Sequence, residues 1–551
     1  MIYRWLNQEA QQFLDNGYLI NGQTVDQRVT DICYHAERLL NKPGFAEKFK
    51  EYIQKGYYSL STPVWANFGL RRGLPISCFG SYMDDTMESI VRTYAEVSMM
   101  TKYGGGTSAY FGKLRPRGSL IQDNGESGGP VSFMLPYETL IKVISQGSTR
   151  RGSFAAYLDI ESPDIMEFLK LHSDGNPIQQ MSFGVCVTDD FMQRMIDGDK
   201  TARKVWARVL EVRANTGFPY IIFIDNANKN APPEYRGKIT HSNLCTEIFL
   251  PDNSDESFVC DLGSMNILYY DEWKHTDAVE MMIYFLDAVM TEFIEKARGI
   301  YGLDRAVRFA ERHRAVGLGW LGWHSYLQSH MIPFDSMEAK FKNVEIAKFI
   351  ERKANEATIR LGSEYGVPEA LSNAHTINSN TGRRNGTVSA IAPTTSSAFI
   401  IGQVSQSIEP FTSNYYIKDL AKGKFSIRNR QLEQLLEEKG KNTKTTWKSI
   451  LSNGGSVQHL EFLDDHEKSV FKTFEQISPR EIIIQAAQRQ KYIDQGQSLN
   501  LWIHPKMPIK DLNALLIEAW QLGVKSLYYQ HSMNAAQEFS RKLLNCSSCE
   551  A

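Results

Sequence analysis

The chain has 551 residues, with 61 Lys and Arg against 63 Asp and Glu, and a formal net charge of −2. This near balance argues against a protein that binds the phosphate backbone of nucleic acids. A hydrophobic content of 42% and a charged content of 23% are those of a soluble globular protein, and the length predicts a few domains or one large barrel with additions.

The N-terminus lacks a basic segment followed by a long apolar run, and no later stretch is apolar enough to span a bilayer. We therefore expect a cytoplasmic protein that does not act at a membrane. The seven cysteines are too few and too scattered for the disulfide framework of a secreted protein. Those that matter should act as thiols, metal ligands or redox pairs.

The first sixty residues predict helices. Between Val25 and Leu40 apolar residues recur at helical spacing, and Asn41, Pro43 and Gly44 end the segment. Two loops rich in glycine and arginine follow, at 104–118 and 145–152. Such loops suit phosphate, because bare amides approach closely and guanidinium binds two oxygens, although most of them are ordinary turns.

Short apolar runs alternate with helical segments between residues 154 and 258, which favours an α/β fold. Within this part, residues 242–248 place the single thiol of Cys245 between Asn243 and Glu247. In an extended or gently looped backbone, residues two apart project to the same side, so the three side chains could share a pocket. The alternative is a buried cysteine in an ordinary strand, but a buried Asn and Glu would then need partners.

Two later stretches have motifs with competing interpretations. Gly317, Gly319 and Gly322 fit the dinucleotide fingerprint G-x-G-x-x-G, but the preceding residues are charged and not a buried strand. We therefore predict that these glycines serve close packing. Residues 393–397 follow the apolar run 388–392, and consecutive hydroxyls at a helix start suit either a phosphate site or a helix cap.

The C-terminal part predicts a helix at 511–522 and a strand at 524–530, which contains Tyr528 and Tyr529. The chain ends in the pair Cys546-x-x-Cys549. Half of a zinc site would fit this pair, but no second pair of ligands exists. Because termini are normally mobile, a dithiol there can travel to another site.

Taken in order, these features resemble the large (alpha) subunit of class I ribonucleotide reductase. The residues that carry the resemblance run from about Ser61 to the last residue: Cys78, 242–247, Cys260, 393–397, 527–530, Cys546 and Cys549. The resemblance implies an α/β fold with a ten-stranded α/β barrel of two half-barrels. The expected parts are a helical region at 1–60, the barrel at 61–530 with a small α/β insertion around 420–510, and a flexible redox tail at 531–551.

The resemblance also implies a task for each residue at the centre of the barrel. Cys245 would be oxidised to a thiyl radical that takes the 3′-hydrogen of the ribose. Cys78 and Cys260 would deliver two electrons as the 2′-hydroxyl leaves as water, and would end as a disulfide. Glu247 would handle the proton at the 3′-oxygen, and Asn243 would hold the ribose hydroxyl.

Tyr528 and Tyr529 would pass the radical to the barrel from a metal-containing small (beta) subunit, and this chain itself would hold no metal. In a regular strand the two rings would lie on opposite faces, so a stacked relay requires an irregular backbone. Cys546 and Cys549 would reduce the disulfide in the barrel and be recharged by thioredoxin or glutaredoxin.

Two further sets of residues match nucleotide sites of the family. The set that would hold substrate phosphate and ribose is Thr62, Ser77, Asn243, Thr394, Thr395, Ser396 and Ser397. The set that would bind a dNTP or ATP effector at the homodimer interface is Asp85, Arg115, Gln146 and Arg150. Many members begin with a roughly ninety-residue ATP-cone. The region before Ser61 is too short for it, so we expect no overall activity switch within this chain.

The activity implied is the reduction of ribonucleoside diphosphates to deoxyribonucleoside diphosphates. The nearest rival is the adenosylcobalamin-dependent class, which shares the three barrel cysteines but needs no tyrosine relay. The glycyl-radical class would need a C-terminal glycine signature that the last residues lack. Two other rivals are a non-catalytic nucleotide-binding protein built on a decayed reductase and a simple dithiol oxidoreductase that uses only the terminal pair.

Overall fold

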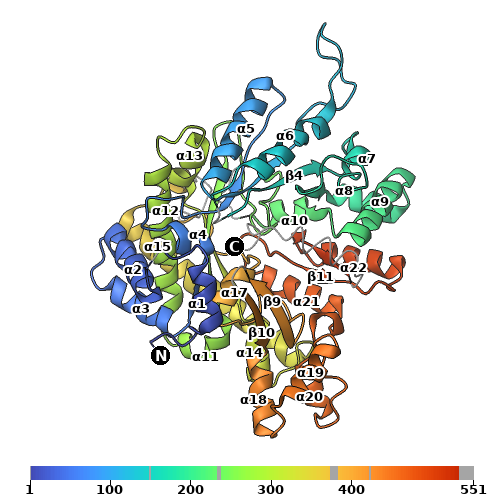
Figure 1. The fold of residues 1–551 in the computed structure, drawn as a ribbon. Helices are drawn as coiled ribbons and strands as arrows, with labels where there is room; N and C mark the ends of the chain where they lie inside the picture. The colour runs from blue at the N-terminus through green and yellow to red at the C-terminus, as the bar shows by residue number, and fades with distance from the viewer. Residues whose placement is uncertain are drawn as a thin grey trace.

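The computed structural model describes residues 2–20, 22–147, 150–231, 237–372, 382–420 and 423–532. Its N-terminal region is helical, with α1 (Gln8–Asp15), α2 (Val25–Leu40) and α3 (Phe45–Gln54). A capping box between Thr24 and Gln27 begins α2, and Asn41 in the left-handed conformation ends it. The predicted helix at 25–40 is confirmed. In Figure 1 these helices (blue) lie on one side of the barrel, opposite α9 (Lys200–Thr216) and α22 (Ile509–Gln521).

One half of the barrel is a sheet of five parallel strands. Hydrogen bonding runs in the order β2 (Cys78–Gly80), β3 (Gly106–Tyr110), β4 (Ser153–Asp159), β5 (Ser182–Val187) and β6 (Tyr220–Phe223). These strands are buried throughout except at single ends, as expected for parallel strands that are covered on both faces.

The other half begins with β7 (Phe258–Asn266) and the parallel strand β8 (Val316–Leu321). It continues through the short segments 388–391 and 496–499, which add parallel bridges at Leu318–Ser389 and Ile391–Gln497. The N–H of Tyr528, which follows β12 (Ser526–Leu527), then donates to the carbonyl of Leu499 at 2.9 Å.

Two antiparallel seams join the halves, β2 with β7 and β6 with β12. The described residues therefore close a ring of ten strands, and the predicted barrel of two half-barrels is confirmed.

Helices cover the outside of this barrel. They include α12 (Ala278–Ala297), α13 (Asp304–His313), α15 (Met337–Tyr365) and α21 (Pro479–Gln490). Helix α12 is buried around almost its whole circumference, because it packs on β7 and β8 on one side and on α15 on the other. This double layer shields the interior of the barrel from water.

A second, smaller hydrophobic core lies outside the barrel. It is built from α18 (Arg430–Glu438), α19 (Lys444–Ser452), α20 (Asp465–Val470) and the loops between them. Of the hairpin β9 (Tyr415–Leu420) and β10 (Gly423–Arg428), Tyr415 packs against this core, whereas Ile427 belongs to the main core. The three helices form the lobe at the bottom of Figure 1. The main core resumes at Phe474, and α21 and α22 both contribute to it. The separate core thus covers the first part of the insertion that we expected around 420–510.

Two glycines of the fingerprint, Gly317 and Gly319, lie inside strand β8, and Gly322 lies between β8 and α14 (Trp323–Ser329). A Cβ atom on Gly319 would lie 2.6 Å from the carbonyl oxygen of Ala390, and one on Gly317 would lie 2.8 Å from the Ala390 Cβ. These glycines let segment 388–391 approach β8, so the prediction of close packing is confirmed.

Gly319→Ala should therefore destabilise the protein by about 1–3 kcal/mol, because the added methyl group meets backbone that cannot move aside. The midpoint of thermal unfolding measures the effect. Gly128→Ala is the matched control, since its Cβ would meet chiefly the side chain of Ser132. Equal midpoints for the two variants would contradict the role of Gly319 in closing the barrel.

Candidate active site

The segment between α10 (Ile224–Lys229) and β7 passes through the interior of the barrel and carries Cys245. Strands of both halves hold its backbone with side-chain hydroxyls. The bonds are Tyr157 to the carbonyl of Asn243 at 2.5 Å, Ser498 to that of Cys245 at 2.6 Å, and Ser526 to that of Thr246 at 2.8 Å. Cys245 is therefore fixed at the centre, with 3% of its surface exposed.

The backbone around Cys245 is a compact turn, whereas the sequence argument assumed an extended or gently looped backbone. Oδ1 of Asn243 accepts the N–H groups of Glu247 and Ile248, each at 3.1 Å, and Thr246 has a φ of +68°. The side-chain amide of Asn243 thus stabilises the turn in place of a regular ladder. Asn243, Cys245 and Glu247 are all buried in the same interior.

Three side-chain polar atoms at this turn lack a hydrogen-bond partner among the residues that the structure describes. They are Nδ2 of Asn243, Oγ1 of Thr246 and Oε1 of Glu247, whereas Oε2 of Glu247 accepts from Ser498 at 3.1 Å. Unpaired polar atoms are costly in a core, so their presence indicates a place for a polar ligand. An amide donor beside a carboxyl suits a ligand that carries hydroxyl groups.

Cys78 and Cys260 lie directly opposite each other across the antiparallel seam of β2 and β7. Opposed residues in such a pair have Cβ atoms about 4.5–5.5 Å apart, and a disulfide needs about 3.5–4.5 Å. Both thiols are buried and reduced. Burial raises the pKa of Cys78, and the nearby Glu247 carboxylate raises it further. Cys78, Cys260 and Glu247 therefore share the interior that holds Cys245.

Burial raises the pKa of the Glu247 carboxyl to about 7, despite its hydrogen bonds. Such a group exchanges a proton near neutral pH, as a general acid or base must. It also costs stability. Because the pKa in the folded protein lies above the ordinary 4.5, the carboxyl opposes folding increasingly as pH rises from about 4.5 to about 7.

Glu247→Gln should consequently stabilise the protein at alkaline pH, because an amide carries no charge to bury. We expect its gain in unfolding free energy to grow by about 2 kcal/mol between about pH 5.5 and 8. Thermal unfolding at the two pH values measures this difference, with Glu461→Gln at an exposed position as the control. A gain independent of pH would contradict a raised pKa for Glu247.

Tyr528 and Tyr529 interrupt the predicted strand, because they lie between β12 and β13 (Gln530–His531). Their ring centroids are 4.2 Å apart at an interplanar angle of 56°. Tyr220 of β6 packs on both, at 4.8 Å from Tyr528 and 5.2 Å from Tyr529. The backbone thus has the irregularity that a relay requires. Tyr528 is 2% exposed and Tyr529 is half-buried, so the pair leads from the interior toward the surface.

The predicted substrate residues lie at element ends. Thr62 begins α4 (Thr62–Asn67), Ser77 precedes β2, and Thr394 caps α17 (Thr395–Ile400), with its Oγ1 accepting the N–H of Ser407 at 2.8 Å. Helix α17 packs on β1 (Tyr58–Leu60), two residues before Thr62. This contact brings the helix that carries Thr395, Ser396 and Ser397 to the strand that ends two residues before Thr62.

The four predicted effector residues divide into two pairs. Asp85 and Arg115 form an ion pair at 2.7 Å, and the N–H of Arg115 also donates to Asp85. Both side chains are about one-third exposed, so this pair is open to a ligand.

Gln146 and Arg150 turn inward instead. Gln146 donates to Oδ1 of Asn67 at 2.8 Å, and Arg150 donates to the carbonyl of Gly104 at 2.8 Å and to Oγ1 of Thr62 at 2.5 Å. Arg150 is 2% exposed. The structure thus joins Arg150 to a predicted substrate residue and not to the Asp85–Arg115 pair. Cys546 and Cys549 lie outside the described residues.

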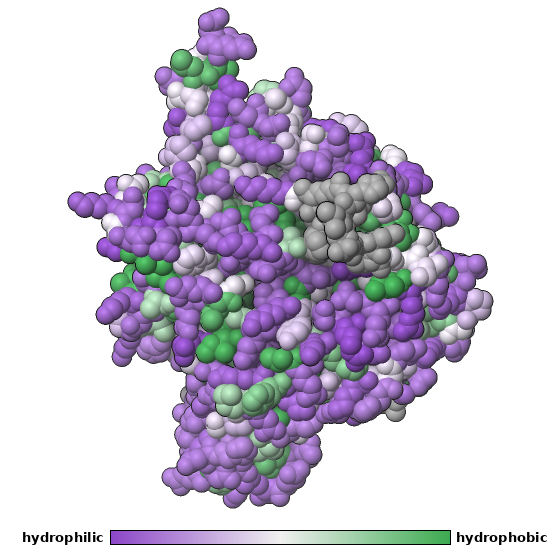
Figure 2. Space-filling model, turned by 180° about the vertical axis from the view of Figure 1, so that it is seen from behind, coloured by the Kyte–Doolittle hydropathy of each residue, from purple (hydrophilic) through white to green (hydrophobic). Residues whose placement is uncertain are grey.

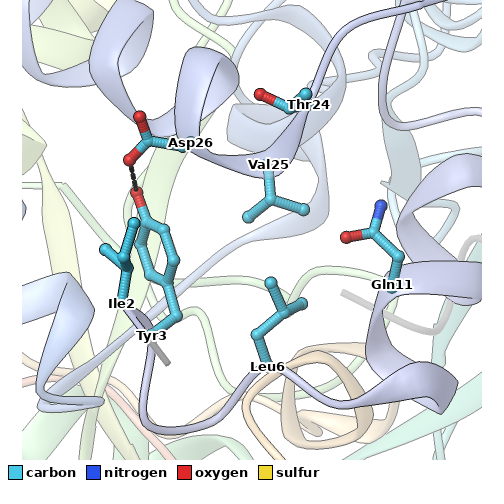
Figure 3. Close-up of a pocket in the computed structure, with 7 residues that line it drawn as sticks. All are labelled: Ile2, Tyr3, Leu6, Gln11, Thr24, Val25 and Asp26. Atoms are coloured by element: carbon cyan, nitrogen blue, oxygen red, sulfur yellow. Dashed lines mark hydrogen bonds between the residues drawn. The ribbon is translucent and has the colours of Figure 1, made fainter.

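Two pockets of the described residues lie apart from the predicted site residues. A pocket of about 260 Å³ lies among the N-terminal helices, where the hydroxyl of Tyr3 donates to Asp26 at 2.8 Å (Figure 3). A second, of about 530 Å³, lies beside α8 (Asp189–Asp197) and α9. Neither is lined by a residue predicted above.

The rear face in Figure 2 is largely hydrophilic. Among the described helices, none combines the length and the apolar character that a bilayer crossing requires. No cluster of three or more His, Cys, Asp or Glu side chains in the described part of the chain could hold a metal ion.

Sequence reasoning missed Tyr157, Ser498 and Ser526, which hold the turn, and Gln495, whose amide contacts Cys260 at 3.3 Å. Each is a common residue type without a local motif. Only the closed barrel brings them to the turn, so no signal in the sequence alone identifies them.

Comparison with known proteins agrees with this geometry. Residues 76–201, 197–380 and 374–530 match the family described as ribonucleotide reductase, barrel domain. The chain is 36% identical over 543 residues to a putative ribonucleoside-diphosphate reductase large subunit of Frog virus 3, covering 92% of this chain and 93% of that protein. It is 28% identical to the large subunit of Danio rerio, covering 94% of this chain and 74% of that protein.

A solved structure has the same fold over nearly the whole chain. The class Id ribonucleotide reductase alpha subunit of Actinobacillus ureae matches with a TM-score of 0.91 and 53% identity, covering 97% of this chain and 98% of that one. The chain therefore belongs to the ribonucleotide reductase family of oxidoreductases, among its class I large subunits.

Proposed function

We propose that this chain reduces ribonucleoside diphosphates to deoxyribonucleoside diphosphates by thiyl-radical chemistry at Cys245. The observation that carries the proposal is the convergence in one water-shielded interior of Cys245, the opposed pair Cys78 and Cys260, and the unpaired polar atoms of Asn243 and Glu247. A radical needs protection from water, and a ribose would satisfy both unpaired atoms.

Each residue then has one task in a balanced reaction. The Cys245 sulfur radical takes the 3′-hydrogen atom, while the ionised Glu247 accepts the 3′-hydroxyl proton and Asn243 holds a ribose hydroxyl. The 2′-hydroxyl leaves as water with a proton from one thiol of the pair, and the other thiol supplies the hydrogen that C2′ gains. Cys78 and Cys260 thereby supply two electrons and form a disulfide, Glu247 returns the proton to the 3′-oxygen, and Cys245 returns the hydrogen to C3′. Substrate and two thiols thus give product, water and one disulfide.

The phosphates of the substrate would lie at Thr62, Ser77 and residues 394–397. The proximity of α17 to the start of α4 supports one site for these hydroxyls. The contact of Arg150 with Thr62 would bring a guanidinium to the same place, where it suits phosphate oxygens.

The radical would come from a metal-containing small (beta) subunit through Tyr529 and Tyr528. The close contact of these rings and the outward position of Tyr529 support this direction. The terminal pair Cys546 and Cys549 would reduce the barrel disulfide and be recharged by thioredoxin or glutaredoxin in the cytoplasm.

Exposed apolar side chains support a homodimer through α5 (Met87–Lys102) and α6 (Gly129–Val143), which lie side by side at one end of the molecule (Figure 1). They are Met87, Val91, Leu135 and Val143, each at least 43% exposed. Clusters of this kind mark interfaces. Asp85 and Arg115 lie at the start of α5, where a dNTP or ATP effector would meet both copies.

The test is deoxycytidine diphosphate formation from CDP with an effector nucleotide and dithiothreitol. Three additions are compared: none, adenosylcobalamin, and the metal-loaded small subunit from the same source. We expect product only with the small subunit. Product with adenosylcobalamin would be consistent with the radical reaction in the barrel but would contradict the need for a small subunit and for the tyrosine relay. No product with any of the three additions would contradict the proposed reaction.

A further inference from the structure

Gln495 contacts both parts of the reaction machinery. It lies just before barrel segment 496–499 and is fully buried. Its Nε2 donates to Sγ of Cys260 at 3.3 Å and to Oγ1 of Thr387 at 2.9 Å, and its Oε1 accepts the N–H of Phe249 at 3.1 Å. One side chain thus joins the redox pair to the loop that carries Cys245.

The orientation of this amide is fixed by its partners. The backbone N–H of Phe249 can only donate, so the atom of Gln495 that faces it must be the oxygen. The nitrogen must therefore face Cys260 and Thr387, and its two hydrogens serve one acceptor each. Cys260 consequently has a permanent donor aimed at its sulfur.

A donor in this position distinguishes the two ways in which a thiolate can split the disulfide, because either Cys78 or Cys260 can leave as a thiolate. A neutral thiol or disulfide sulfur is a weak acceptor, whereas a thiolate is a charged and strong one. The contact of Gln495 therefore stabilises negative charge on Cys260 more than it stabilises the disulfide. Burial raises the pKa of the Cys260 thiol, and the bond from Gln495 opposes that rise.

The surroundings of Cys78 favour the opposite role. Glu247 raises the pKa of both thiols and is the first charged cause at Cys78, where the neighbouring polar side chains of Ser77 and Asn243 oppose the rise. Next to Cys260, burial raises the pKa of Asp261 well above its ordinary value, which favours the uncharged carboxyl. Cys78 is also the more exposed of the two residues, at 6% against 1% for Cys260. An incoming thiolate thus reaches Cys78 more easily, and Cys260 is the sulfur that more easily leaves as a thiolate.

We propose that Gln495 directs re-reduction of the Cys78–Cys260 disulfide, by making Cys78 the sulfur that is attacked and Cys260 the sulfur that leaves. The inference rests on the proposed function. A dithiol supplies the electrons: its first thiolate bonds to Cys78 and breaks the disulfide, and the Cys260 thiolate departs against the Gln495 amide and later takes a proton. The second thiolate of the dithiol then displaces Cys78, which leaves as a thiolate and is protonated.

The experiment traps the first step. The full-length chain with Cys546→Ser and Cys549→Ser, which removes the terminal dithiol, is oxidised with diamide and then treated with 2-mercaptoethanol. Acid quenching, denaturation and alkylation with N-ethylmaleimide leave the mercaptoethanol adduct on the attacked cysteine and the alkyl label on the leaving one. Peptide mass spectrometry gives the ratio of adducts on Cys78 and Cys260.

We expect the adduct on Cys78 in at least roughly tenfold excess, as a hydrogen bond to a charged group of ordinary strength would give. In Gln495→Met the ratio should fall toward one and the exchange should slow. Gln495→Leu, which also removes the donor, should behave alike and serves if the Met variant does not fold. An adduct mainly on Cys260, or a ratio unchanged in the Gln495 variants, would overturn the proposal.

Gln497→Met is the matched control, because Gln497 is buried two residues away and its side chain contacts Arg489, Ala486 and Gln490 instead of a cysteine. It should keep the ratio of the parent. One holoenzyme turnover with CDP and no external reductant distinguishes a failure of the proposed function from a failure of the role of Gln495. If no Cys78–Cys260 disulfide forms there, the proposed function fails. If it forms and exchange is unselective, only the role of Gln495 fails.

Discussion

Cys245→Ser should abolish deoxynucleotide formation, by roughly 10⁴-fold or more, while leaving the fold intact. The reason is the strength of the bond that must form and break, since an alcohol O–H is too strong to exchange a hydrogen atom reversibly with a ribose carbon and a thiol S–H is not. Structural damage should be small. Serine is slightly smaller, and the carbonyl of residue 245 can still accept from Ser498.

The assay is CDP reduction by the holoenzyme, with thermal unfolding as the check on folding. Cys186→Ser is the matched control, because Cys186 is a buried thiol of β5 that donates to the carbonyl of Thr240 at 3.4 Å, a bond that serine can keep. That variant should retain activity. Substantial reduction by Cys245→Ser would contradict a thiyl radical at this position.

The same variant separates the rival functions. A simple dithiol oxidoreductase that used only Cys546 and Cys549 would keep thiol–disulfide exchange after Cys245→Ser and would never have reduced CDP. A non-catalytic descendant of a reductase would fail to reduce CDP even with Cys245 present. Only a reductase loses nucleotide reduction and keeps exchange through its terminal pair.

The sequence sufficed for residues that lie within one short motif. Asn243, Cys245 and Glu247 are neighbours in the chain, so they stay close together in any fold, and the family resemblance was enough to assign their tasks. The reason offered for their shared pocket was an extended or gently looped backbone, and the structure has a compact turn there instead. The side chain of Asn243 accepts backbone N–H groups of a turn, and Thr246 adopts a left-handed conformation that no local sequence pattern predicted.

Residues that meet only through the barrel were harder to predict. The register of β2 with β7 sets Cys78 opposite Cys260, and neither strand contains information about that register on its own. The resemblance supplied the pair instead. It also grouped Arg150 with Asp85, whereas tertiary contacts send Arg150 inward to Thr62. Loop side chains are placed by what surrounds them, and a motif does not encode those surroundings.

Tyr528→Phe and Tyr529→Phe should each lower CDP reduction with the small subunit at least roughly a thousandfold, a rise of about 4 kcal/mol in the barrier. Phenylalanine keeps the ring contacts at 4.2 and 4.8 Å that hold the pair against Tyr220. It lacks the phenolic hydrogen, so it cannot pass on an electron and a proton together. The loss should therefore appear in turnover and not in folding.

Tyr137→Phe is the control, because Tyr137 is a buried tyrosine of α6 whose ring stacks on Phe154 at 4.3 Å, away from Cys245 and the tyrosine pair. It should remain active. Thiol–disulfide exchange at Cys78 and Cys260 should also persist in both relay variants, since electrons from a dithiol do not pass through the tyrosines. If Tyr528→Phe turned over CDP at the parental rate, the radical would have to reach Cys245 by another route, and the irregular backbone at 528–529 would serve packing alone.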